Sequence, residues 1–342
     1  MTAKSRGGRT PVGGMRVGLS VTFAALAPAE RSAIEHAWKA AARVAGRWRP
    51  AFLAMGVEPI TDRAEIDLLV YLGESSRFEQ VAGNLASRVP IVFVKSTVEE
   101  LLATSPGAPR RYRFCTGVRG ISQALASVAP KVPTVDWQSV PWGEGLAPMC
   151  HLDEAEGRYV ATSIAAFREA AQAGGIAWRT GVPPGAEPFS VFLTVHDPAA
   201  ATLAEAALGR WPHCTVLAAD GMVATRAPGG NSWPSRLIRV RHWSPRIRST
   251  SNRLFRAALD GERMPDFDSA GMLFGTMIFL DAAFGHGVPP DRLEEAGPHP
   301  GPLGLTGLTV SGRPRPERLV VFQGQRLQVV TIDRFERPPE PS

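Results

Sequence analysis

Apolar residues in the first third of the chain gather in short continuous runs that alternate with stretches of helical periodicity. Glu65–Leu72 contains one such run, which Gly73 ends, and Val89–Val94 is another. Between Pro28 and Ala45 the apolar residues instead recur three and four positions apart, as on the buried face of a helix. Continuous apolar runs are typical of strands that are buried on both faces of a parallel sheet.

The same alternation continues along most of the chain. The predicted strands are 16–21, 52–57, 65–72, 89–94, 146–152, 176–180, 189–195 and 215–219. The predicted helices are 28–45, 77–87, 97–104, 117–128, 154–174 and 199–208. This order predicts βαβ units and parallel sheets, and the Pro-, Gly- and Trp-rich stretch 130–148 predicts a crossing between two lobes.

The last third of the chain predicts two helices and a β-hairpin. After a helix at 252–259, the helix Ala270–Phe284 has almost no polar face, which predicts burial on most sides. It is too short to span a bilayer. Leu319–Phe322 and Leu327–Ile332 are β-rich runs, and Gln323-Gly324-Gln325 between them predicts the hairpin turn.

The order of several loose motifs resembles that of type I periplasmic-binding-protein domains, in the subgroup that binds branched-chain amino acids and amides. The resemblance spans about residues 15–332. The matching segments are 67–76, 89–94, 152–174, 182–185, 216–221, 265–281, 303–312 and 320–330. It implies an α/β fold of two Rossmann-like lobes with parallel sheets, joined by a hinge and closing on a small molecule.

The resemblance also implies a domain layout in which the C-terminal part of the chain returns to the first lobe. Residues 15–138 and about 252–332 are expected to form the N-terminal lobe and hinge, and 139–251 the second lobe. The helix 270–284 should pack on the first lobe, and the final hairpin should lie near the hinge. Residues 1–14 are expected to be a disordered extension, and 333–342 a flexible tail.

The N-terminus has two interpretations. Basic residues between Lys4 and Arg16 precede an apolar stretch that ends in Ala25-Leu26-Ala27, as in a signal peptide. Alternatively, Met15–Phe23 is the first strand of the fold, which we favour because Pro28 would directly follow the cleavage site. Three scattered thiols, Cys115, Cys150 and Cys214, suit a reducing compartment. We therefore expect a cytoplasmic rather than a periplasmic location.

Candidate ligand-binding residues follow the predicted strands of the first lobe. Hydroxyl groups and free backbone N–H groups at such strand ends suit a carboxylate or another anion. The candidates are Ser20, Phe23, Ser75, Ser76, Ser96 and Thr97. In amino-acid-binding members of the family, the loops at 73–76 and 95–97 would hold the ligand carboxylate. Simple N-capping is the alternative role for Ser75 or Ser76.

Two acidic residues are the candidates in the second lobe. Where the family has a Tyr before a Gly, this chain has Glu156 before Gly157, and Asp220 follows the predicted strand 215–219. Either carboxylate suits a ligand amine or hydroxyl group. The replacement of the Tyr puts a simple branched-chain amino acid in doubt as the ligand.

Other features carry less functional information. The chain has 38 Lys and Arg against 32 Asp and Glu, a net charge of +6, which is too small an excess to predict a nucleic-acid partner. Seven arginines between Arg236 and Arg256 are expected to form a solvated edge. Two Cys–His pairs, 150–151 and 213–214, would make a zinc site only if their strands met, and adjacent strand residues point to opposite faces. No motif of a catalytic or cofactor site is present.

Three functions remain open. The chain is a solute receptor that delivers its ligand to the permease of an ABC-type importer, or a cytoplasmic ligand sensor that acts through a protein partner. The third is an enzyme on a similar two-lobe scaffold, such as a sugar isomerase or a racemase-like protein. An enzyme would need acid–base residues from both lobes, for example Glu74 facing Glu156 or Asp220.

Overall fold

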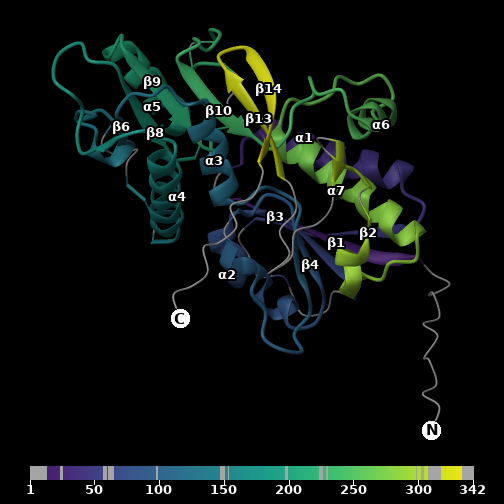
Figure 1. Cartoon of the computed structure of the whole chain (residues 1–342). Coiled ribbons are helices and arrows are strands. Elements are labelled where there is room, and N and C mark those ends of the chain that lie inside the picture. Colours follow the sequence, from purple (N-terminus) through teal and green to yellow (C-terminus); the bar gives the residue numbers. More distant parts are fainter. Residues whose placement is uncertain are drawn as a thin grey trace.

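Two mostly parallel β-sheets, with helices packed on both faces of each, form the two lobes of the chain (Figure 1). The computed structural model describes residues 14–23, 26–56, 60, 65–97, 99–146, 151–152, 154–196, 199–222, 226–228, 230–297, 299–301, 304–306 and 317–332. The predicted α/β class with two lobes is confirmed.

The first sheet has the strand order β2-β1-β3-β4-β5, and all neighbouring pairs are parallel. Its strands are β1 (Met15–Thr22), β2 (Trp48–Met55), β3 (Leu68–Gly73), β4 (Ile91–Phe93) and β5 (Arg111–Arg113). In β3, Leu68, Val70 and Leu72 enter one core, whereas Leu69 and Tyr71 enter the core on the opposite face. Burial on both faces explains the continuous apolar run in the sequence.

Helices α1 (Pro28–Val44), α6 (Thr250–Ala258) and α7 (Asp268–Gly285) cover one face of this sheet, and α2 (Phe78–Ala86) covers the other. The predicted placement of the apolar helix on the first lobe is therefore correct. Short elements complete the lobe: η1 (Ser75–Arg77), η2 (Glu99–Leu102), η5 (Pro290–Glu295), β11 (His299–Gly301) and β12 (Gly304–Thr306). Among the residues that the structure describes, no helix combines the length and apolar character needed to cross a bilayer.

The second sheet has the order β14-β13-β10-β9-β8-β6-β7. Its strands are β6 (Thr134–Asp136), β7 (Trp178–Arg179), β8 (Phe189–Leu193), β9 (Cys214–Ala218), β10 (Leu237–Arg241), β13 (Glu317–Gln323) and β14 (Arg326–Ile332). The short helix η3 (Trp137–Ser139) follows β6, α5 (Ala199–Arg210) covers one face, and α3 (Val118–Val128) and α4 (Glu154–Ala173) pack together on the other. The parallel part, β7-β6-β8-β9-β10, repeats the strand order of the first sheet.

The sheets correct the expected domain layout at two places. The chain enters the second lobe between β5 and α3, at residues 114–117, because α3 already packs on the second sheet. Pro130 and Pro133 mark only the loop between α3 and β6, since such residues occur in any tight connection. Strand β13 pairs antiparallel with β10, so 317–332 extend the second sheet and not the first (Figure 1). The chain returns to the first lobe through residues 242–249, between β10 and α6. The turn of the final hairpin lies near this segment, because Arg246 Nη1 donates to the carbonyl of Gln325 at 2.9 Å.

The expectation of a solvated arginine edge was wrong for the strand β10. Arg239 and Arg241 are buried, and their guanidinium groups lie 4.9 Å and 5.9 Å from the ring centre of Phe322. Arg241 also forms an ion pair with Asp266 at 3.1 Å. The sequence did not predict this strand, because Arg239 and Arg241 interrupt its apolar pattern. The strand is nevertheless buried, because the hairpin β13–β14 pairs with it. Arg246, Arg248, Arg253 and Arg256 are exposed, as expected.

The interpretation of the N-terminus as a strand is supported by its pairing. Strand β1 lies inside the first sheet, with β2 on one side and β3 on the other. Residues 1–13 and the tail 333–342 lie outside the described residues, and so do 147–150, which make up most of the strand expected at 146–152.

Candidate ligand-binding site

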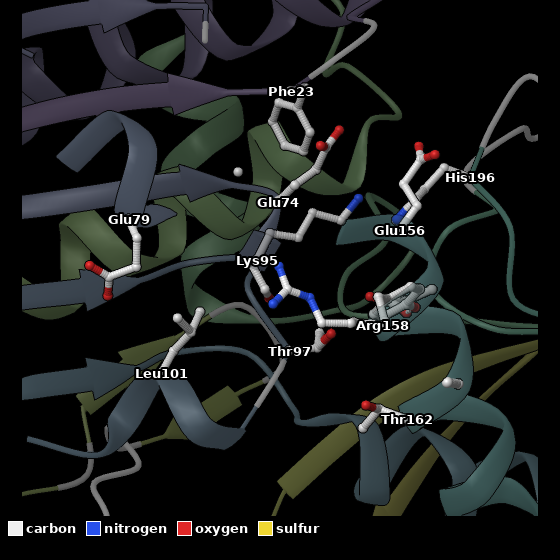
Figure 2. Close-up of a pocket in the computed structure, with 15 residues that line it drawn as sticks. Phe23, Glu74, Glu79, Lys95, Thr97, Leu101, Glu156, Arg158, Thr162 and His196 are labelled. Atoms are coloured by element: carbon white, nitrogen blue, oxygen red, sulfur yellow. Dashed lines mark hydrogen bonds between the residues drawn. The ribbon is translucent and has the colours of Figure 1, made fainter. Parts of the chain in front are cut away.

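A cavity of about 750 Å³ lies between the two lobes, where the carboxyl ends of their strands face each other (Figure 2). The first lobe contributes Phe23, Gly73, Glu74, Ser75, Glu79, Lys95, Thr97 and Leu101. The second lobe contributes Glu156, Arg158, Tyr159, Ala161, Thr162, His196 and Asp220. Carboxyl ends of parallel strands, at the points where the strand order reverses, are the usual ligand sites of open α/β sheets.

The first-lobe wall consists of three consecutive strand ends. Phe23 follows β1, Gly73–Ser75 lead from β3 into η1, and Lys95 and Thr97 follow β4. Gly73 is paired with Thr22, and a Cβ atom at Gly73 would overlap the Thr22 carbonyl. Only glycine therefore lets β1 and β3 approach so closely at the edge of the cavity.

The candidate residues of the first lobe separate into two groups. Phe23, Ser75 and Thr97 line the cavity. Ser20 and Ser96 are buried inside the lobe: the Ser20 hydroxyl lies 3.3 Å from Thr22 Oγ1, and Ser96 Oγ donates to the Gly73 carbonyl at 2.8 Å. Ser96 thus joins the loop after β4 to the end of β3. Ser76 lies in η1, and its side chain is outside the described part of the structure.

Both acidic candidates of the second lobe, Glu156 and Asp220, line the cavity. The Tyr159 hydroxyl donates to Asp220 Oδ1 at 2.7 Å, and the Tyr159 ring stacks on His196 with 5.2 Å between ring centres. Burial, and then the negative charge of Asp220, raise the pKa of Tyr159 well above its usual value. The phenol therefore stays protonated and donates to one carboxylate oxygen, which fixes Asp220 toward the cavity.

Several cavity residues were not candidates from the sequence, among them the polar residues Lys95, Arg158, Tyr159 and His196. Lys95 belongs to the predicted loop 95–97, so its place at that strand end was a usable signal, although only Ser96 and Thr97 were named as candidates. Arg158 and Tyr159 lie in the first turns of α4, and only the observed orientation of that helix turns them toward the first lobe. Figure 2 shows Arg158 directed from α4 toward Lys95 and Thr97.

A buried charge cluster lies behind the cavity and joins α7 to both crossing segments. The carboxylate of Asp268 accepts from the His242 backbone N–H at 3.3 Å, and the same oxygen lies 3.5 Å from His242 Nδ1 and 3.9 Å from Lys95 Nζ. His242 Nε2 lies 3.2 Å from the Thr116 carbonyl, which only accepts, so this nitrogen carries a proton.

In this cluster, contact between the charged groups shifts the pKa values of Asp268 and His242 in the direction opposite to burial. Burial works to raise the pKa of Asp268, but contact with His242 and the charge of Lys95 lower it to about 2. Burial works to lower the pKa of His242, but contact with Asp268 and the charge of Asp220 raise it above 6.5. The cluster is therefore an imidazolium–carboxylate pair in mildly acidic solution, below pH 6.5 and above about pH 4.

We expect Tyr159→Phe to destabilise the protein by about 1–3 kcal/mol, since Asp220 is almost fully buried and would lose a hydrogen-bond donor. Urea unfolding followed by circular dichroism measures this change. Tyr112→Phe is not a matched control, because the Tyr112 hydroxyl group also accepts a hydrogen bond from the Leu293 backbone N–H. An unchanged free energy of unfolding in Tyr159→Phe would show that water replaces the phenol at Asp220.

The described residues contain no group of three or more His, Cys, Asp or Glu side chains that is arranged to hold a metal ion. Cys150, which the zinc hypothesis needs, lies outside the described residues. Burial raises the pKa of Cys214 to about 12, so this thiol stays protonated.

Glu74, named in the enzyme hypothesis, lines the cavity opposite Glu156 and forms an ion pair with Arg77 at 2.7 Å.

No protein-family model matches the chain, and no curated protein is similar to it in sequence. Solved structures are similar in fold. A leucine-binding protein from Thermotoga maritima has a TM-score of 0.67 at 13% identity, over 93% of this chain and 99% of that one. A branched-chain amino acid transporter substrate-binding protein from Streptococcus pneumoniae, in complex with isoleucine, has a TM-score of 0.65 at 14% identity, over 94% and 100%.

A third similar structure is an ABC-transporter solute-binding protein from Rhodopseudomonas palustris in complex with 3,4-dihydroxybenzoic acid. Its TM-score is 0.65 at 14% identity, over 95% of this chain and 98% of that one. All three matches extend over both lobes, which confirms the resemblance inferred from the order of the motifs at the level of the fold. The chain has the fold of the type I periplasmic binding proteins: two Rossmann-like lobes, joined by crossing segments, around an interlobe cavity.

Proposed function

We propose that this chain captures a small amino acid- or amide-like molecule in the interlobe cavity and closes its two lobes on it. The cavity itself is the observation that carries the proposal. Its volume of about 750 Å³ is lined by both lobes and falls within the range of small-molecule sites. A ligand that contacts both lobes stabilises the closed arrangement more than the open one, because some of its contacts form only on closure.

The side chains in the cavity support a ligand with polar groups on an apolar body. The hydroxyl groups of Ser75 and Thr97 suit a carboxylate or an amide, and the carboxylates of Glu156 and Asp220 suit an amine or hydroxyl group. Phe23 adds an apolar ring to the first-lobe wall of the cavity. Proteins of the same fold that hold isoleucine or a dihydroxybenzoic acid are consistent with this class of ligand.

Two cellular settings fit such a protein: the solute receptor of an ABC-type importer, with a permease as partner, and a cytoplasmic sensor with a regulatory protein as partner. We favour the cytoplasmic setting, because cleavage before Pro28 would remove β1 from the middle of the first sheet. Mass spectrometry of the protein from its own host tests this choice. A mature chain that begins near Pro28 would favour the transport receptor.

Filling the cavity should weaken ligand binding without unfolding the protein. Ala161 lines the cavity from α4, whereas Ala165, one turn later, is exposed and is not among the lining residues. We expect Ala161→Trp to weaken ligand binding at least about tenfold, a loss of about 1.4 kcal/mol, and Ala165→Trp to leave it unchanged. The ligand is found first by a thermal-shift screen of amino acids, amides and aromatic carboxylates.

Three measurements on the ligand that the screen finds separate the remaining hypotheses. Equal binding by both tryptophan variants would place the site elsewhere. Compaction of the wild-type protein with ligand, measured by small-angle X-ray scattering, would support closure of the lobes. Chemical turnover of a bound compound would favour the enzyme hypothesis, with Glu74 and the second-lobe acids as candidate acid–base groups.

A further inference from the structure

Lys95 is a nearly buried cation without a complete set of partners. Its side chain follows β4, lines the cavity and is only 10% exposed. Its ammonium group has three N–H donors. Among the described residues it makes no hydrogen bond, and its one ion-pair contact is with Asp268 at 3.9 Å. A charge in such a place is stable only when further groups of opposite charge or acceptors approach it.

Asp268 does not fully neutralise Lys95, because its carboxylate is shared with His242. The same oxygen, Oδ2, accepts from the His242 backbone and lies 3.5 Å from the His242 ring. Within the first lobe and the crossing segments, the Lys95 ammonium group and the His242 ring thus approach the same carboxylate oxygen. Asp268 therefore satisfies Lys95 only in part, and the Lys95 ammonium group lies at the wall of the cavity.

A second cation enters the same cavity from the opposite lobe. Arg158 is exposed on α4 and has no ion-pair or hydrogen-bond partner within the described part of the chain. Figure 2 shows its guanidinium group directed toward Lys95 and Thr97. A guanidinium and an ammonium group that face one space from two lobes suit a carboxylate or a similar anion.

The acids of the cavity are mostly engaged elsewhere. Glu74 pairs with Arg77 at 2.7 Å, Glu79 lies 3.6 Å from Arg111, and Asp220 accepts from Tyr159. Glu156 and Asp220 line the same cavity from the second lobe, so their carboxylates compete with a ligand for Lys95.

We propose that Lys95 and Arg158 bind the anionic group of the ligand from opposite lobes, so that the cavity selects organic anions over their neutral amides. The inference rests on the proposed function and specifies the charge of its ligand. Lys95 also links the bound anion to Asp268 and His242, so the ligand charge acts next to the segments through which the lobes are joined.

The test is a binding screen with matched pairs, in which each carboxylate is compared with its primary amide. Benzoate with benzamide and N-acetyl-leucine with its amide are the first two pairs, and neutral sugars and amines complete the panel. We expect the carboxylate of at least one pair to bind about tenfold or more tightly than its amide. If an amide binds as tightly as its acid, or if only neutral or cationic compounds bind, the charge proposal is overturned while ligand capture stands. If no compound of any charge binds, both proposals fall.

Two variants test the residues themselves. Lys95→Met and Arg158→Met should each weaken binding of the carboxylate about tenfold or more and leave binding of the amide nearly unchanged. Lys39→Met and Arg168→Met are the controls, because both residues are exposed and neither is among those that line the cavity. Arg158 is exposed on a helix, so Arg158→Met gives a result even if Lys95→Met does not fold. Unchanged affinity for the carboxylate in Arg158→Met would overturn the two-cation site.

Discussion

Replacing Asp268 with alanine is expected to lower the free energy of unfolding by about 3–5 kcal/mol, the usual cost of removing one partner of a buried ion pair. The carboxylate is fully buried and contacts two cations, Lys95 and His242. Without it, both charges remain inside the protein uncompensated, and the His242 backbone N–H loses its acceptor. Urea unfolding at pH 5.5, where His242 is charged, measures the effect.

A matched pair on the surface provides the control. His36 and Glu262 lie 3.8 Å apart with side chains 47% and 63% exposed. Glu262→Ala should change the free energy of unfolding by less than about 1 kcal/mol, because an exposed pair is screened by water. Similar losses in the two variants would show that Asp268 is not stabilised by its buried position between the two cations.

The contribution of the Asp268–His242 pair depends on pH in a defined direction. The pKa of Asp268 is lowered from 3.8 to about 2, so its contribution is present above about pH 4 and is lost as the pH falls toward 2. The pKa of His242 is raised above 6.5, so its contribution is present below pH 6.5 and is lost as the pH rises through the raised value. We expect the difference between wild type and Asp268→Ala to be largest between about pH 4 and 6.5. A difference that stays constant from pH 5 to 9 would contradict a charged His242.

Gly271→Ala should cost about 3 kcal/mol, at the upper end of the range for an overpacked core. Gly271 lies in the first turn of α7, and a Cβ atom there would overlap the indole ring of Trp243. The ring is fully buried, packs near Phe255 and donates from Nε1 to Asn252 Oδ1 at 2.6 Å. It therefore has no free space to move into without breaking that hydrogen bond.

Gly285→Ala is the control for helix propensity. Gly285 ends the same helix in an exposed position, where an added Cβ atom meets only Arg47 Nε at 3.9 Å. Alanine there should be neutral or stabilise the helix by up to about 1 kcal/mol. Thermal unfolding of both variants provides the comparison. If Gly271→Ala is as stable as Gly285→Ala, then Trp243 is not held against α7 in solution.

Helix α7 shows why the crossing segment 242–249, which leads from β10 to α6, was hard to recognise. Gly271 lies against Trp243, and Asp268 accepts from the His242 backbone N–H, so the helix covers this segment. In the sequence this segment was part of an arginine-rich stretch that predicts a solvated edge. Arg241 and His242 are instead buried, because the hairpin and α7 cover them.

A third of the residues that line the cavity were recognisable as candidates from local patterns. Phe23, Ser75, Thr97, Glu156 and Asp220 lie at predicted strand ends or at a predicted helix start, and the structure brings all five to one cavity. Their roles in binding remain predictions. Ser20 and Ser96 belong to the same segments but are buried by neighbouring strands, and the direction of a side chain at a strand end is not a local property.

The sequence by itself determined most of the layering of this protein: the long helices, and the strands such as β3, β8 and β9 that are continuous apolar runs. These features depend on contacts of each residue with its near neighbours and with water, so apolar periodicity reports them. The strands β5, β6 and β10 were not predicted. The strand order of the first sheet recurs in the parallel part of the second sheet, as expected when each lobe is built from such a series of βαβ units.

Only the tertiary structure decided where the chain crosses between lobes, which sheet the final hairpin joins, and how Lys95, His242 and Asp268 meet. His242 and Thr116 are 126 positions apart, and strand β13 pairs with β10 across α6 and α7. Contacts between such distant segments are chosen by the packing of whole elements and by the need to pair open sheet edges and buried charges. No pattern within a single segment contains that information.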